Sequence, residues 1–252
     1  STPSPVGSDA VVSRGRLGLF QTDVSQLVRN SPVKRFAVAL AATVLVITPA
    51  LAQKPVRSLP QPAATAPSTP APRDVAYPGT LKLAGDATDL DRRIFSIRQS
   101  IPVSSTGPMT LLYSQWIMGN HAPRGPIYNY SGLKMTVGGK PLAWTRDPGD
   151  VYAFRVDVPQ GAKTIEIEAQ FLSAIEAAQG PIMMTPEMLK LNWYIAALYP
   201  AGHYTRKVNF DVSVKLPQGW DYATARETAS SANGVVKFKT ADWETVIDSP
   251  LF

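Results

Sequence analysis

The stretch Lys207–Leu216, KVNFDVSVKL, alternates polar and apolar residues over its whole length. Because successive side chains of a β-strand point to opposite faces, one face of this stretch is polar and the other is apolar. The apolar face consists of Val208, Phe210, Val212, Val214 and Leu216. This pattern is typical of an antiparallel strand with one face in the core and the other in water.

The same two-residue period recurs along most of the chain after Tyr77. Residues 164–171 and 152–158 alternate in this way, and the turn signal Pro159-Gln160-Gly161 separates them. Gly138-Gly139 joins two further segments as the turn of a hairpin. Other strands are predicted around Phe95, Ile97 and Ile101 and at 80–84, 109–117 and 235–239. We therefore predict an all-β domain, an antiparallel β-sandwich with one short helix.

The helix is predicted to begin at Thr185. Threonine is a good N-cap, Pro186 suits the first helical position, and Glu187 complements the positive end of the helix dipole. Met188 and Leu189 would continue this helix, and the turn residues 199–202 would end it.

The charge of the chain is concentrated before this β-rich region. The 252 residues include 25 basic and 19 acidic ones and no cysteine, which excludes disulfides and thiolate metal sites. Residues 1–73 hold 8 basic and 2 acidic residues, so the remainder has 25 − 8 = 17 basic and 19 − 2 = 17 acidic residues. A neutral domain lacks the electrostatic attraction that dominates nucleic-acid binding, so no nucleic-acid partner is expected.

The N-terminal third is predicted to be an export leader followed by a linker. Lys34-Arg35 precedes the apolar residues 36–47, and Ala50-Leu51-Ala52 follows, which together are typical of a Sec-type signal peptide cleaved after Ala52. An uncleaved anchor is the alternative. We assign 1–52 to the leader, 53–74 to a disordered Pro/Ala/Ser/Thr-rich linker and 75–252 to the β-domain. This predicts a periplasmic or secreted bacterial protein that meets the membrane only through its signal peptide.

The sequence offers no local motif for catalysis. His121 and His203 are the two histidines, and neither belongs to an H-E-x-x-H helix, so no catalytic or metal-binding residue is assigned. A zinc site assembled from these two histidines is a remaining option. The aromatic residues Trp116, Trp144, Trp193 and Trp220 suit either a core or a sugar-binding platform.

The least ordinary segment is the loop that follows the strand predicted at 109–117. Residues 113–126, YSQWIMGNHAPRGP, are dense in Gly and Pro and carry Asn120, His121 and Arg124. Polar side chains on a constrained loop are candidates for ligand contact, so these three are the predicted substrate-binding residues. A purely structural corner explains the same composition.

Several runs of the β-rich region resemble the N-terminal domain of the glycyl aminopeptidase family of zinc metallopeptidases. The matching runs are YPGTLKLAGDATDLDRRIFSIRQSIPV (77–103), LLYSQWIMGNHAPRGPI (111–127), AWTRDPGDVYAFRVDVP (143–159), MTPEML (184–189), ALYPAG (197–202) and VIDSPLF (246–252). At two positions where the family typically has proline, this sequence has Ser114 and Met118 instead.

The resemblance implies a secreted exopeptidase whose catalytic domain follows the β-domain. That later domain would bind zinc through H-E-x-x-H and a downstream glutamate, and neither is present in this sequence. We therefore expect a fragment that is inactive alone, ending at Leu251-Phe252 with two exposed apolar residues. Its partners would be its own C-terminal catalytic domain and the peptide substrate of the parent enzyme.

Two functions follow from these observations. In the first, the chain is the non-catalytic β-domain that flanks and shapes the substrate cleft of a zinc-dependent aminopeptidase. In the second, it is a stand-alone exported binding module for peptide or carbohydrate, which would use exposed aromatic residues and free sheet edges.

Overall fold

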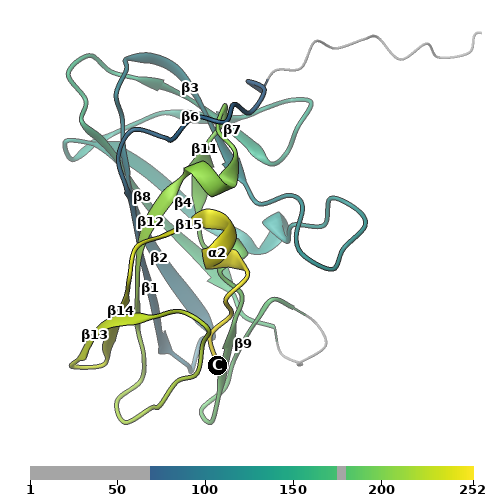
Figure 1. The fold of residues 1–252 in the computed structure, drawn as a ribbon, viewed down its shortest axis with the longest axis vertical. Helices are drawn as coiled ribbons and strands as arrows, with labels where there is room; N and C mark the ends of the chain where they lie inside the picture. The colour runs from purple at the N-terminus through teal and green to yellow at the C-terminus, as the bar shows by residue number, and fades with distance from the viewer. Residues whose placement is uncertain (1–68, 175–179) are drawn as a thin grey trace, which may run out of the picture. The chain divides into compact units, whose positions relative to one another are not determined.

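The computed structural model describes residues 69–174 and 180–252, and the predicted signal peptide lies outside these residues. The described part is built mainly from β-strands (Figure 1). The elements in chain order are β1 (Leu81–Asp89), β2 (Ile94–Pro102), β3 (Gly107–Tyr113), η3 (Ile127–Asn129), β4 (Tyr130–Val137), β5 (Lys140–Pro141), β6 (Trp144–Arg146), β7 (Ala153–Val158), β8 (Thr164–Leu172), β9 (Ile182–Met184), β10 (Leu189–Leu191), η5 (Trp193–Ile195), β11 (Leu198–Pro200), η6 (Thr205–Lys207), β12 (Asn209–Lys215), β13 (Thr228–Ala232), β14 (Val235–Phe238), β15 (Ala241–Asp242) and α2 (Trp243–Ile247). The predicted all-β class is confirmed.

Within the described residues, nine strands form the larger sheet. Its order is β13-β14-β12-β1-β2-β8-β4-β5, and β15 pairs with β12 beside this path. Strand β12 lies within the alternating stretch 207–216 that suggested the fold, and all five predicted apolar positions of that stretch are buried. Strand β12 pairs antiparallel with β14 and β15 but parallel with β1, so the sheet is mixed rather than purely antiparallel.

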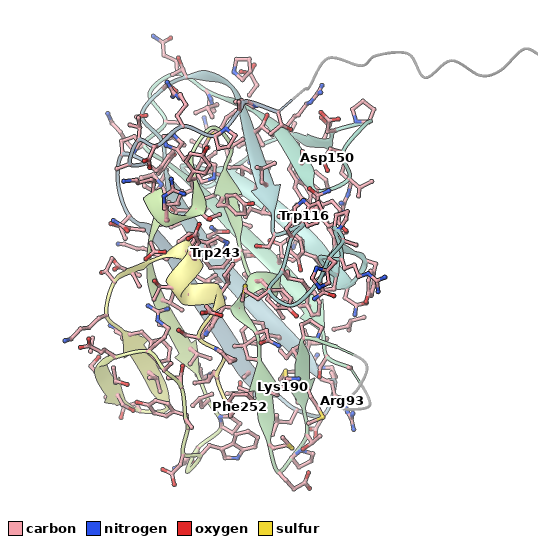
Figure 2. All side chains as sticks on the ribbon, turned by 45° about the vertical axis from the view of Figure 1, so that its right-hand side comes forward. Arg93, Trp116, Asp150, Lys190, Trp243 and Phe252 are labelled. Atoms are coloured by element: carbon pink, nitrogen blue, oxygen red, sulfur yellow. The ribbon has the colours of Figure 1, made fainter. Side chains whose placement is uncertain are left out.

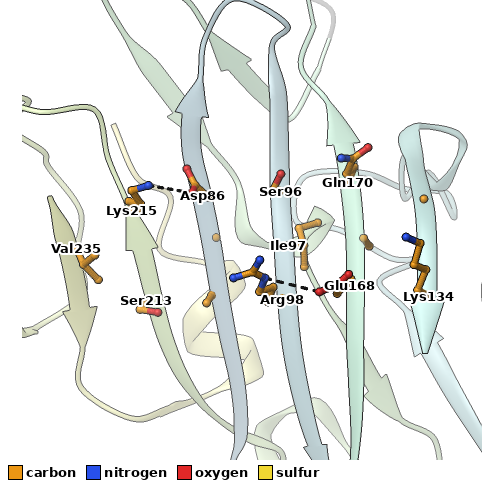
Figure 3. Close-up of a pocket in the computed structure, with 14 residues that line it drawn as sticks. Asp86, Ser96, Ile97, Arg98, Lys134, Glu168, Gln170, Ser213, Lys215 and Val235 are labelled. Atoms are coloured by element: carbon orange, nitrogen blue, oxygen red, sulfur yellow. Dashed lines mark hydrogen bonds and ion pairs between the residues drawn. The ribbon is translucent and has the colours of Figure 1, made fainter. Parts of the chain in front are cut away.

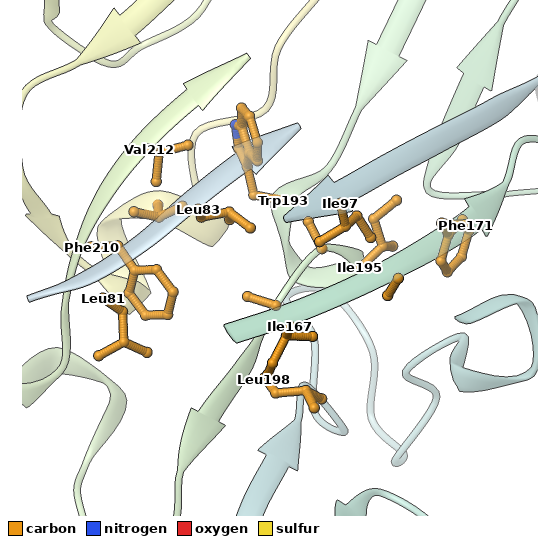
Figure 4. Packing of buried hydrophobic residues seen from close by; sticks show 14 of the residues in the cluster. Leu81, Leu83, Ile97, Ile167, Phe171, Trp193, Ile195, Leu198, Phe210 and Val212 are labelled. Carbon is orange, nitrogen blue, oxygen red and sulfur yellow. The ribbon is translucent and has the colours of Figure 1, made fainter. Parts of the chain in front are cut away.

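A second sheet packs against the buried face of the first. Its order is β11-β3-β7-β6, and β9 and β10 form a separate two-stranded hairpin. Side chains from both sheets and from η5 share one hydrophobic core, part of which is drawn in Figure 4. Its largest fully buried members include Trp193, Trp243, Tyr113, Phe95, Phe154, Phe171 and Phe210. This two-layer arrangement confirms the predicted sandwich.

One buried polar side chain links the two sheets. Gln99 of β2 is 2% exposed and donates from Nε2 to the carbonyl oxygen of Leu198 in β11 at 2.5 Å. The backbone N–H of Leu198 donates in return to Oε1 of Gln99 at 3.0 Å. Because β11 lies at the edge of its sheet, one row of its backbone groups has no neighbouring strand, and this side chain supplies partners there.

The prediction of a helix that begins at Thr185 is wrong. Residues 185–188 form the turn between β9 and β10, in which the N–H of Thr185 donates to the carbonyl oxygen of Met188 at 2.9 Å. The hydroxyl oxygen of Thr185 accepts from the N–H groups of Glu187 and Met188, as a cap would. The same residues therefore suit a tight turn, and the paired strands on both sides decide between the two.

The α-helix of the described region is α2, which follows Asp242. The Asp242 carboxylate caps it by accepting from the N–H of Thr245 at 3.0 Å and from its hydroxyl at 2.7 Å. After α2 the chain passes Leu251, which is fully buried and pairs with Leu191, while Phe252 is 53% exposed. The expectation of two exposed apolar residues at this point is therefore wrong for Leu251.

Arg73, which precedes β1, forms backbone hydrogen bonds with the β-domain. Its N–H donates to the carbonyl oxygen of Gly202 at 3.1 Å, and its own carbonyl oxygen accepts from the N–H of Tyr204 at 3.3 Å. Among the residues that the structure describes, none belongs to a helix long and apolar enough to cross a membrane.

Candidate functional site

The loop of residues 114–126, which connects β3 to η3, is fixed at its base. The N–H of Gly125 donates to the carbonyl oxygen of Gln115 at 3.0 Å, and the hydroxyl of Tyr152 donates to the carbonyl oxygens of Pro123 and Gly125 at 3.3 and 3.1 Å. A Cβ atom on Gly125 would lie 1.9 Å from the carbonyl oxygen of Ser114. Only glycine allows this approach, so the two ends of the loop are held together.

The three predicted substrate-binding residues lie together on this loop. Asn120, His121 and Arg124 are all exposed. The side-chain amide of Asn120 donates back to the carbonyl oxygen of Met118 at 3.3 Å, so it stabilises the tip of the loop. His121 and Arg124 form no hydrogen bond or ion pair with any described residue. None of the three lines the hollow beside this loop, and their contact with substrate stays a prediction.

A hollow of about 310 Å³ lies where the loop leaves β3. Figure 2 labels three of the residues that line it, namely Trp116 on the loop, Asp150 before β7, and Trp243 in α2. The lining set is Thr69, Leu112, Tyr113, Ser114, Gln115, Trp116, Asp150, Tyr152, Tyr199, Thr205, Trp243 and Ile247. The segment 113–126, which the sequence singled out, supplies Tyr113 and Trp116 to this lining. The other aromatic residues, Tyr152, Tyr199 and Trp243, come from distant positions in the sequence.

The aromatic lining of this hollow is held in place and stays neutral. The indole N–H of Trp243 donates to the hydroxyl oxygen of Ser114 at 3.3 Å, which ties α2 to the root of the loop. Burial, assisted by the nearby Asp150 carboxylate, raises the pKa of Tyr199 to about 12. Burial also raises the pKa of Tyr113 well above its usual value. At neutral pH these phenols therefore stay protonated and cannot act as bases.

Large apolar side chains are exposed around the loop. Trp116 is 62% exposed, Met118 47%, Tyr128 77% and Val151 55%. Tyr128 lies in η3 directly after the loop, and Val151 precedes Tyr152, whose hydroxyl holds the loop. We call these four residues the Trp116 patch. Exposed apolar residues on a rigid loop and on the segments next to it are typical of an interaction surface.

The described residues do not fit a zinc ion. Nδ1 of His203 lies 2.8 Å from the carbonyl oxygen of Val75, and its ring meets Tyr77 edge-on at 5.2 Å. His203 therefore holds the segment that leads into β1. No group of three or more His, Asp or Glu residues in the described region is close enough together to bind a metal. This speaks against a zinc site built on His121 and His203.

A second hollow, of about 520 Å³, lies on the exposed face of the larger sheet (Figure 3). Small residues such as Ala84, Ser96 and Ser213 leave it open between longer charged side chains. Lys215 pairs with Asp86 at 3.4 Å, and Arg98 lies 3.9 Å from Glu168. Exposed pairs of this kind contribute little energy and define no ligand class, so this face is a solvated sheet surface.

Comparison with known proteins assigns the described domain to a class. Residues 82–252 match the family model of the peptidase M61 N-terminal domain. The match covers more than half of the chain, and the chain therefore belongs to this family. The predicted resemblance to the N-terminal domain of a zinc metallopeptidase is confirmed. A search of curated proteins found no match to the sequence.

Three solved structures are similar to this chain at low sequence identity. An aminopeptidase N family protein from Idiomarina loihiensis aligns with a TM-score of 0.57 and 14% identity, over 68% of this chain and 29% of its own length. An M1 zinc metallopeptidase from Deinococcus radiodurans aligns with a TM-score of 0.41 and 11% identity, over 71% of this chain and 41% of its own. Yeast LTA4 hydrolase in complex with bestatin aligns with a TM-score of 0.41 and 9% identity, over 71% and 28%. The chain thus spans less than half the length of each of these proteins.

Proposed function

We propose that this chain is the non-catalytic N-terminal β-domain of a secreted, zinc-dependent glycyl aminopeptidase, and that it flanks and shapes the substrate cleft of that enzyme. The observation that carries the proposal is the Trp116 patch, whose Trp116 and Met118 lie on a loop with a fixed base. A rigid apolar surface beside a hollow suits a permanent neighbour in the same polypeptide better than it suits bulk water.

The proposed role is one of positioning rather than chemistry. In the parent enzyme, zinc bound by the catalytic domain would polarise the scissile carbonyl group and activate a water molecule. The described residues supply no ligands for that metal. Instead, they would form part of the wall of the substrate cleft. The loop carrying Asn120, His121 and Arg124, together with the hollow beside it, would limit which N-terminal residues of a peptide substrate enter the cleft.

Export of the parent protein is part of the same proposal. It rests on the basic pair Lys34-Arg35, the apolar residues 36–47 and the Ala50-Leu51-Ala52 end. N-terminal sequencing of protein secreted by an expressing bacterium tests it. A mature terminus at Gln53 supports export by this signal, and retention of residues 1–52 contradicts it.

The decisive experiment for the cleft role is to express the complete reading frame that contains this chain. We expect an H-E-x-x-H sequence after residue 252 and release of p-nitroaniline from glycine p-nitroanilide, with no release by residues 53–252 alone. Replacing Trp116 and Met118 together by serine should raise KM or reduce the amount of folded enzyme. Val75→Ser is the matched control, because Val75 is 55% exposed and does not belong to the Trp116 patch. A reading frame that stops at residue 252, or activity from the isolated domain, would refute the proposal.

A further inference from the structure

A third hollow, of about 500 Å³, lies beside the turns that follow β12 and β13. Its lining residues are far in the sequence from the 114–126 loop. It is lined by Thr88, Lys215, Leu216, Pro217, Gln218, Gly219, Trp220, Tyr222, Ser231, Asn233, Gly234 and Val236. Its volume is in the range of small-ligand sites in proteins. None of its lining residues lines the hollow beside the loop.

The first wall of this hollow is the turn of residues 217–220. The N–H of Trp220 donates to the carbonyl oxygen of Pro217 at 3.3 Å, which closes a four-residue turn. Gly219 occupies its third position with φ of +80°, as a type II turn requires. The turn therefore holds Gln218 and Trp220 at fixed positions on the same wall.

The opposite wall is the hairpin turn between β13 and β14. Asn233 and Gly234 both have positive φ, at 54° and 74°, which is the backbone geometry of a type I′ turn. The N–H of Leu216 donates to the carbonyl oxygen of Gly234 at 2.8 Å, so the two turns are joined by a hydrogen bond. The walls are thus set before any ligand binds.

Two aromatic side chains in this hollow are half-buried. Trp220 and Tyr222 pack against the edge of the core while lining the hollow. The Tyr222 ring meets Phe238 edge-on at 6.4 Å, and its hydroxyl lies 2.9 Å from the hydroxyl oxygen of Thr228. These contacts limit the movement of the ring, so a ligand can meet it without a large cost in side-chain entropy.

The polar groups of this hollow are neutral. The side chains of Gln218, Ser231 and Asn233 form no hydrogen bond within the described residues. Carboxamides can donate and accept at the same time, as can hydroxyl groups. The one cation, Lys215, is already paired with Asp86 at 3.4 Å. The hollow therefore offers aromatic surface and unused neutral hydrogen-bonding groups, with no uncompensated charge among its described lining residues.

We propose that this hollow is a binding site for an uncharged oligosaccharide. Pyranose rings carry apolar C–H faces that stack on aromatic rings, and hydroxyl groups that both donate and accept hydrogen bonds. Trp220 would provide the stacking surface, and Gln218 and Asn233 would bond the hydroxyl groups. A charged glycan or nucleic acid is disfavoured by the same neutrality. This function is independent of the proposed cleft role.

The test is a titration of the full chain followed by ¹⁵N–¹H NMR, with chitohexaose, cellohexaose and maltohexaose as probes. We expect at least one probe to give saturable shifts confined to residues 217–222 and 231–234, with a dissociation constant on the order of 1 mM. Tetra-alanine with an acetylated N-terminus and an amidated C-terminus is added in parallel as an uncharged peptide. No saturable shift with any of the three sugars, shifts located elsewhere, or tighter binding of tetra-alanine at this hollow would overturn the proposal.

Three variants separate binding from folding. Trp220→Ala should weaken binding about tenfold or more, which corresponds to loss of one good contact. Asn233→Gly removes the carboxamide at a position with positive φ, where glycine is at ease, and should weaken binding about threefold to tenfold without loss of fold. Tyr204→Ala, which removes an exposed aromatic ring elsewhere, should leave binding unchanged. Wild-type affinity in both Trp220→Ala and Asn233→Gly would refute the site even if sugar binds.

Discussion

The Gln99 side chain gives the most direct test of how the two sheets are joined. Replacing it by leucine keeps a side chain of similar size but removes both hydrogen bonds to the backbone of Leu198. The N–H and C=O groups of Leu198 would then lie in the core without these partners. We therefore expect Gln99→Leu to be strongly destabilising although it makes the core more apolar.

The magnitude follows from the number of groups left without a partner. A buried donor or acceptor that loses its hydrogen bond costs about 1–3 kcal/mol, so two such groups cost about 2–6 kcal/mol. Small domains have a total free energy of unfolding of about 5–15 kcal/mol. With a urea m-value of about 2 kcal/mol/M, the midpoint of unfolding should fall by about 1–3 M.

The assay is urea unfolding of the full chain at pH 7, followed by far-UV circular dichroism and tryptophan fluorescence. Ser100→Ala is the matched control, because it removes a neighbouring hydrogen bond to Glu166 on the exposed face of the same strand, and it should cost less than about 0.5 kcal/mol. If Gln99→Leu lies within 0.5 kcal/mol of the wild type, the bonds between the sheets do not carry the stability assigned to them.

Three further changes test other parts of the structure. Asp242→Ala removes the N-cap of α2 and should lower the free energy of unfolding by about 1 kcal/mol in the same urea assay, whereas Asp242→Asn should restore most of it. Gly125→Ala places a Cβ atom against a backbone carbonyl oxygen, so the 114–126 loop must open, and limited trypsin digestion should cut it at Arg124 much faster than in the wild type. Although burial favours a higher value, the hydrogen bonds from Thr88 and the charge of Lys215 lower the pKa of Asp86. Its contribution is therefore complete above pH about 4 and lost as the pH falls through its lower pKa in the folded state, so the stability difference between wild type and Asp86→Asn should shrink from pH 5 to pH 2. A difference that is constant over this range would contradict that assignment.

The sequence predicts the strands well because burial on one face of a sheet imposes a period of two. The alternation at 207–216 locates β12, and Gly138-Gly139 correctly marks the turn between β4 and β5, with both φ values positive. The pairing partners of the strands cannot be predicted in this way. Strands β1 and β12 are parallel neighbours separated by more than a hundred residues, and nothing within either strand specifies its partner.

Local signals also fail where two structures need the same residues. Thr185-Pro186-Glu187 suits a helix start and equally suits a tight turn, and only the pairing of β9 with β10 decides. The candidate site shows the same limit. The loop was predictable from its composition, but Tyr199 and Trp243 line the adjacent hollow only because β11 and α2 pack beside β3. No pattern within either segment indicates that neighbour.

Two sets of aromatic side chains at the surface of the described region differ in their chemistry. In the Trp116 patch, large side chains are 47–77% exposed, and Met118 adds a flexible apolar surface. Such side chains gain most from being covered by a protein surface. Around Trp220 the rings are half-buried and lie between unused carboxamides, so a ligand must satisfy hydrogen bonds as well as cover carbon. Without the catalytic domain of the parent enzyme, the Trp116 patch should therefore promote self-association, whereas the surface around Trp220 should not. This difference is measurable, because Trp116→Ser should reduce self-association of the isolated domain in analytical ultracentrifugation, whereas Trp220→Ala should not.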